Sequence, residues 1–107
     1  MVLNFFSLLF CLFLIASCNT SNQEINPKSS AEEKGKFLFM KHCASCHGKD
    51  GKLGSSGAKD LSNTNLSDKD LFSIISKGKG SMPAMVNLFK DSLEISLVIS
   101  HLKTLKK

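Results

Sequence analysis

Apolar residues recur at the spacing of an amphipathic helix in three segments of this chain. Each segment follows a residue that can cap a helix, namely Ser30, Ser67 or Asp91. Glutamate lies three residues after the first and the third of these caps, at Glu33 and Glu94, and Ser30 with Glu33 has the pattern of a capping box. No segment alternates as a strand would, so the pattern predicts an all-α fold. The apolar positions are Phe37, Leu38, Phe39 and Met40 in the first segment, Leu71, Phe72, Ile74 and Ile75 in the second, and Ile95, Val98, Ile99, Leu102 and Leu105 in the third.

Two stretches with the composition of loops separate the three predicted helices. The first carries Gly48, Gly51, Gly54 and Gly57 among lysine, serine and aspartate residues. The second begins at Gly78, where the middle helix is expected to end, and reads Gly-Lys-Gly-Ser-Met-Pro-Ala-Met. The expected order is therefore helix, loop, helix, loop, helix.

An apolar segment precedes the predicted domain. Residues 2–16 hold no charged side chain and are shorter than the roughly 20 residues that a transmembrane helix needs. They are typical of the apolar core of a signal peptide. The segment ends in Ile15-Ala16-Ser17-Cys18, which resembles a bacterial lipobox, where a cysteine after small residues receives diacylglycerol. We therefore expect residues 1–17 to be removed as a lipoprotein signal peptide and Cys18 to be lipidated; an uncleaved membrane anchor is the alternative.

Residues 18–30 are expected to form the lipidated N-terminus and a flexible tether. They are polar, with one proline and few apolar side chains, and a dozen such residues typically span roughly 20 Å. The folded domain is then residues 31–107. Both interpretations of the N-terminal segment place this domain outside the cytoplasm, in the periplasm or on the extracytoplasmic face of a cell membrane.

The run Cys43-Ala44-Ser45-Cys46-His47 is the C-x-x-C-H pattern of covalent c-type haem attachment. Its thiols add to the two vinyl groups of a haem, and the histidine becomes the proximal iron ligand. A zinc half-site and a redox-active cysteine pair are the alternatives. Zinc needs four ligands, and outside this run only His42 and His101 remain as plausible soft ligands in the mature chain. A redox-active pair is expected in a βαβ context, which the sequence does not show. The pattern occurs once, so it predicts one haem c, bound by Cys43 and Cys46 with His47 on iron.

The second axial ligand is expected from the loop between the last two helices. We predict Met82, because a thioether suits haem iron and because Pro83 fixes the backbone beside it. Met85 is the alternative, although it also suits a place in the core. Met40 is expected to pack within the fold, and His42 to lie at the surface beside the edge of the ring.

Residues 31–107 resemble a small bacterial class I cytochrome c. The resemblance rests on three stretches, residues 35–48, 75–84 and 93–105. It implies three to five helices wrapped around one covalently bound haem, with histidine and methionine as axial ligands, and one-electron transfer as the function. It also implies that the first and last helices cross where a glycine packs on an aromatic residue, and Gly35 matches that glycine.

Two positions depart from the family pattern. His101 stands where the family has the aromatic residue of the last helix; it can pack against Gly35 in the same way, and an alternative interpretation makes it an iron ligand. Lys59 stands where family members often have a proline whose carbonyl accepts a hydrogen bond from the proximal histidine. The Lys59 carbonyl can accept the same bond from His47.

Charge and composition narrow the choice of function. The chain has fourteen lysines, no arginine and nine acidic residues, which gives a net charge of +5. Such a charge favours redox partner proteins with acidic docking surfaces or an anionic membrane, whereas no basic run with interleaved aromatic residues indicates nucleic-acid binding. The sequence favours an electron carrier over an enzyme. The alternatives are a haem-based sensor or peroxidase-like enzyme with a labile sixth ligand, and a cytochrome subunit of a larger oxidoreductase.

Overall fold

The computed structural model describes residues 26–106 of the chain. Within this range there are four α-helices and three short 3-10 helices, and the only β pairing is an isolated bridge between Lys79 and Met82. The predicted signal peptide and Cys18 lie outside the described residues. The all-α prediction is confirmed. In chain order the elements are α2 (Ala31–His42), α3 (Ala44–His47), η2 (Ser55–Gly57), η3 (Leu61–Asn63), α4 (Asp68–Lys77), η4 (Val86–Leu88) and α5 (Ser92–Thr104).

The three predicted helices begin at their predicted caps. The Ser30 side chain accepts the N–H of Glu33 at 3.1 Å, and the Glu33 carboxylate accepts the N–H of Ser30 at 2.7 Å. The Ser67 and Asp91 side chains each accept the backbone N–H three residues further on. Each such cap stabilises a helix by about 1 kcal/mol, and together the three caps define where the helices begin.

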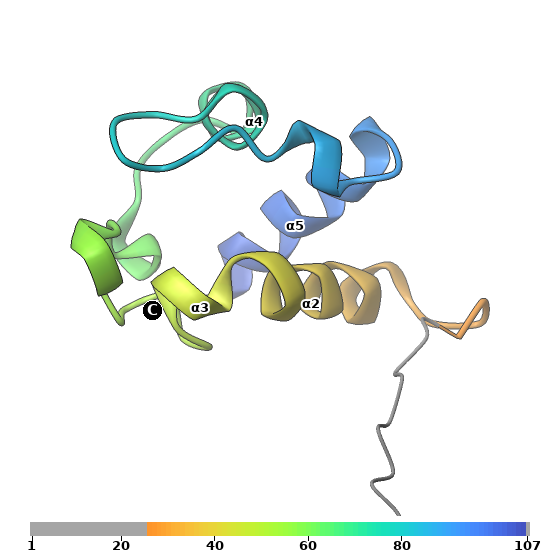
Figure 1. The fold of residues 1–107 in the computed structure, drawn as a ribbon. Coiled ribbons are helices and arrows are strands. Elements are labelled where there is room, and N and C mark those ends of the chain that lie inside the picture. Colours follow the sequence, from red (N-terminus) through yellow and green to blue (C-terminus); the bar gives the residue numbers. More distant parts are fainter. Residues whose placement is uncertain (1–25, 107) are drawn as a thin grey trace, which may run out of the picture.

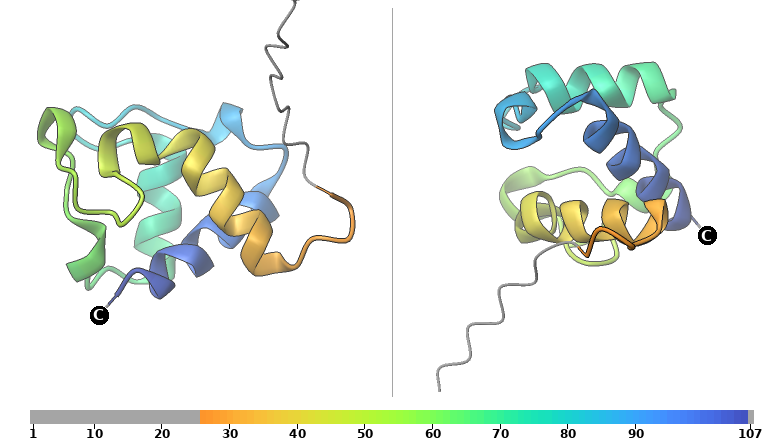
Figure 2. Two further views of the ribbon diagram at one scale, coloured as in Figure 1. Left: turned by 90° about the horizontal axis from the view of Figure 1, so that it is seen from below. Right: turned by 90° about the vertical axis from the view of Figure 1, so that its right-hand side faces the viewer.

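Helices α2 and α5 cross in close contact at Gly35 (Figures 1 and 2). A methyl group built on Gly35 would overlap the carbonyl oxygen of Leu97 and would lie 3.5 Å from the Cβ of His101. The crossing therefore leaves no room for any side chain at position 35. The predicted packing of His101 against Gly35 is confirmed, and the His101 ring also lies 5.1 Å from the ring of Phe39.

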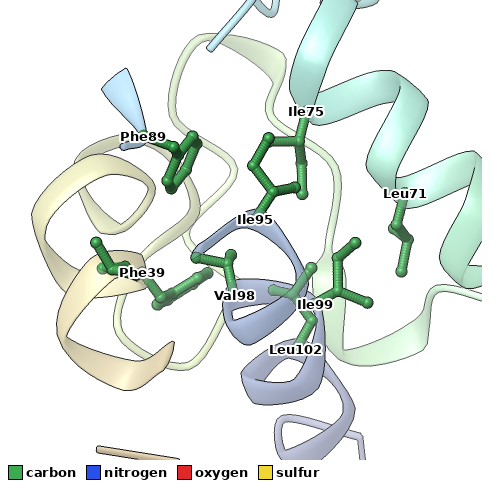
Figure 3. Close-up of a cluster of buried hydrophobic side chains, with 9 residues drawn as sticks. Phe39, Leu71, Ile75, Phe89, Ile95, Val98, Ile99 and Leu102 are labelled. Atoms are coloured by element: carbon green, nitrogen blue, oxygen red, sulfur yellow. The ribbon is translucent and has the colours of Figure 1, made fainter. Parts of the chain in front are cut away.

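The core gathers around α5, which lies between α2 and α4 (Figures 2 and 3). Phe39, Ile95 and Val98 are at most 1% exposed. The apolar faces predicted from periodicity are thus the faces turned to the core, although five of the predicted positions are only half-buried, namely Phe37, Met40, Phe72, Ile74 and Leu105. The buried apolar residues are Leu38, Phe39, Leu71, Ile75, Phe89, Ile95, Val98, Ile99 and Leu102. None of the helices between residues 26 and 106 has the length and apolarity that crossing a membrane requires.

Candidate functional site

A large cavity opens between α3 and α4. Its volume is about 820 Å³, within the range of about 300–1,000 Å³ that is common for ligand pockets. The loop after α3 and the loop after α4 also line the cavity. The backbones of these two loops lie below and above each other in Figure 1. Much of the wall is apolar, so the cavity suits a flat apolar ligand and limits the contact of that ligand with water. The apolar lining residues include Phe39, Leu61, Leu66, Leu71, Ile74, Ile75, Met82, Met85, Val98 and Leu102.

The C-x-x-C-H run forms a single helical turn at the wall of this cavity. α2 ends at His42, and the Cys43 carbonyl then accepts the N–H groups of Cys46 and His47 at 3.2 and 3.0 Å. This turn brings both cysteines and His47 to the cavity lining. The cysteines are not paired in a disulfide, and burial raises the pKa of the Cys43 thiol to about 11. Before haem is attached, burial therefore favours the protonated thiol of Cys43.

The ring of His47 is held by one backbone bond. Its Nδ1–H donates to the Lys59 carbonyl at 2.9 Å, since a carbonyl can only accept. The same bond leaves the Nε2 lone pair free, as a proximal haem ligand requires. The predicted bond to the Lys59 carbonyl is confirmed.

The loop after α4 brings both candidate methionines to the cavity. Lys79 and Met82 exchange two backbone hydrogen bonds of 3.0 Å, and the Met85 N–H donates to the Ile75 carbonyl at 2.9 Å. Gly78 permits this tight path, because its φ is +77° and a methyl group there would lie 2.5 Å from the Met82 carbonyl oxygen. Met82 and Met85 are both half-buried and both line the cavity. The choice of Met82 as the axial ligand stays a prediction.

The other two histidines lie in different surroundings. His101 is 8% exposed, belongs to the α2–α5 crossing and does not line the cavity. The structure thus gives no support to the alternative in which His101 binds iron. The expectation that His42 lies at the surface beside the edge of the ring holds only in part: its side chain lines the cavity, but it is half-buried and packs on Phe89. Phe89 comes from the loop before α5 and covers this end of α2. Met40 packs against the core, as expected.

Part of the cavity wall was not singled out from the sequence. Ser55, Ser56, Thr64 and Leu66 reach the cavity from the loop between α3 and α4. These four positions do not recur at the period of a helix or a strand, so the sequence does not distinguish them from solvent-exposed loop residues. Phe89 packs on His42 without lining the cavity, and its burial could be expected because phenylalanine is among the residue types most often buried.

The zinc alternative finds no ligand set in the described part of the chain. Between residues 26 and 106, no three His, Cys, Asp or Glu side chains gather as they would around a metal ion. The apolar cavity instead fits a haem, with two thiols and an imidazole at one wall and thioethers at another.

An all-helical domain with this motif at an apolar cavity defines a small c-type cytochrome, and its cofactor is a covalently bound c-type haem used in electron transfer. Residues 30–96 match the model of the family named cytochrome c oxidase, cbb3-type, subunit III, and the chain belongs to this family. A search of curated proteins found no match.

Proposed function

We propose that this protein is a one-electron carrier whose haem is bound by Cys43 and Cys46 and whose iron is held by His47 and Met82. One observation supports this most: the C-x-x-C-H turn lies at the cavity wall with the Nδ1 of His47 already bonded to the Lys59 carbonyl. Histidine and methionine together would leave the iron no free ligand position, so it would exchange electrons without binding a substrate.

Each residue has a distinct part in this proposal. Haem supplies the reversible one-electron chemistry. Cys43 and Cys46 would hold it by thioether bonds, and the Lys59 carbonyl orients the His47 ring. The soft thioether of Met82 favours ferrous iron and raises the potential. The apolar wall limits the access of water.

A sensor or peroxidase-like enzyme would need an open or labile sixth site. In a native carrier, the ferric protein shows the weak far-red band of sulfur ligation and binds cyanide slowly. A native protein that lacks the band and binds cyanide rapidly would favour the sensor or enzyme.

The family name supports a second candidate, a cytochrome subunit of a larger oxidoreductase. The electron-transfer chemistry of the domain is the same in this case, but the electron would pass within a stable complex. Co-purification of the tagged protein with oxidase subunits under mild detergent separates this candidate from a free carrier, which purifies alone.

We further propose that residues 1–17 are a signal peptide, that residues 18–30 tether residues 31–107, and that lipid on Cys18 anchors the protein to a cell membrane outside the cytoplasm. The apolar run and the small residues before Cys18 support this proposal. The lysine-rich domain then meets redox partners that carry acidic docking surfaces.

Replacing Cys18 with serine is expected to abolish lipid labelling and to move the protein out of the membrane fraction. Serine cannot form the thioether bond to diacylglycerol. The measurement is metabolic labelling with a fatty acid, followed by membrane fractionation, with Cys11→Ser as the matched control that should keep the label. A wild-type protein that is unlabelled and has an N-terminus other than Cys18 contradicts the lipoprotein proposal.

A further inference from the structure

His42 occupies a place next to the haem attachment turn that the electron-transfer proposal leaves unused. It is the last residue of α2, directly before Cys43, and its half-buried side chain lines the cavity. Its ring meets the ring of Phe89 edge-on, with 5.4 Å between the centroids and 66° between the planes. A thioether bond at Cys43 would fix one edge of the haem within one residue of this imidazole.

We propose that His42 tunes the reduction potential of the haem, which is higher when His42 is protonated than when it is neutral. The inference rests on the proposed attachment at Cys43. Because His47 and Met82 are the proposed iron ligands, His42 would act on the iron through the electric field rather than by coordination.

The charges around His42 are few. Lys41 precedes it on α2 and disfavours its protonation, while Glu94 on α5 favours it. Glu94 lies in the first turn of α5 and already accepts the N–H of Lys90 at 2.8 Å, so it is not a dedicated partner of the imidazole. The sole ion pair among residues 26–106 is Lys103 with Asp68, and thus His42 has no carboxylate within ion-pair distance. The charged groups around His42 would therefore offset little of the electrostatic interaction between His42 and the haem.

The sign of the effect follows from electrostatics. Reduction removes one positive charge from the haem, and a protonated His42 is then less strongly repelled. His42 therefore binds a proton from solvent when the haem receives an electron from the redox partner. This coupling occurs in the pH interval between the pKa of His42 beside ferric haem and its pKa beside ferrous haem. The potential falls as pH rises through this interval and is level on either side. Burial is the main cause that lowers the pKa of His42 below its ordinary value of 6.5, so the interval lies on the acid side of that value.

The test is a redox titration of the full-length holoprotein from about pH 4 to about pH 8, a range that spans the ordinary histidine pKa. The wild type should show a potential that falls with pH below 6.5, and His42→Gln should flatten this dependence. His101→Gln is the matched control. It removes a histidine whose pKa is also lowered by burial but which does not line the cavity, and the pH dependence should persist.

A second measurement does not depend on the variants. Ring-proton NMR of the wild type should give a higher pKa for His42 in the ferrous protein than in the ferric protein. A level potential in the wild type, an unchanged slope in His42→Gln, or equal pKa values in both states would overturn the proposal. Haem that extracts into acid acetone would instead contradict the attachment at Cys43, so the two failures are distinguishable.

Discussion

Replacing Met82 with alanine is expected to abolish the far-red charge-transfer band of the ferric protein, open the iron to imidazole and cyanide, and lower the reduction potential. The thioether is a soft ligand that stabilises ferrous iron, and its loss leaves water or a harder ligand in its place. Axial ligands set haem potentials over a span of about 0.8 V, so the fall should be large. Absorption spectroscopy, ligand titration and potentiometry measure the three effects.

Met85→Ala is the matched control for this prediction. Both methionines are half-buried and line the cavity, so loss of packing alone should affect the two variants similarly. Met85→Ala should retain the band and the closed sixth site. If Met85→Ala erases the band and Met82→Ala spares it, the ligand assignment moves to Met85, while the electron-carrier proposal stands.

Replacing Gly35 with alanine is expected to destabilise the fold by about 1–3 kcal/mol or more, because the added methyl group would overlap the Leu97 carbonyl oxygen. The direction of this change in stability is informative, since alanine in a helix is otherwise favoured over glycine by roughly 0.5–1 kcal/mol. Chemical denaturation of the holoprotein measures the change.

Two further variants serve as controls for Gly35→Ala. Lys36→Ala, at an exposed neighbouring position on α2, should change stability by no more than about 0.5 kcal/mol. Leu97→Ala should not rescue Gly35→Ala, because the overlapping atom belongs to the backbone. A Gly35→Ala protein as stable as the wild type, or more stable, would show that α2 and α5 do not cross in such close contact.

The features that could be predicted from the sequence are those with local causes. The caps at Ser30, Ser67 and Asp91 act within three residues, and the helical periodicity that follows each cap identifies its buried face. The C-x-x-C-H turn is equally local, because the Cys43 carbonyl accepts the N–H groups of Cys46 and His47, three and four residues further on. The bond between His47 and Lys59 spans 12 residues, and it was predictable only because the resemblance supplied the position of its acceptor.

The surroundings of His42 could not be predicted in this way. Its neighbour Phe89 comes from a loop near the other end of the domain, and no local pattern connects the two residues. The choice between Met82 and Met85 has a related difficulty. They lie three residues apart in a loop whose path depends on bonds to Lys79 and Ile75, and the loop brings both side chains to the cavity.

The central claim is that Cys43 and Cys46 hold the haem covalently, and its most direct test is the pyridine haemochrome spectrum combined with acid-acetone extraction. In the wild type, haem should remain with the protein after extraction, and the alkaline pyridine spectrum should be that of a haem with both vinyl groups saturated. In the double variant Cys43→Ala/Cys46→Ala, any haem present should extract fully and give a protoporphyrin-type spectrum. Extractable, vinyl-bearing haem in the wild type would contradict the claim.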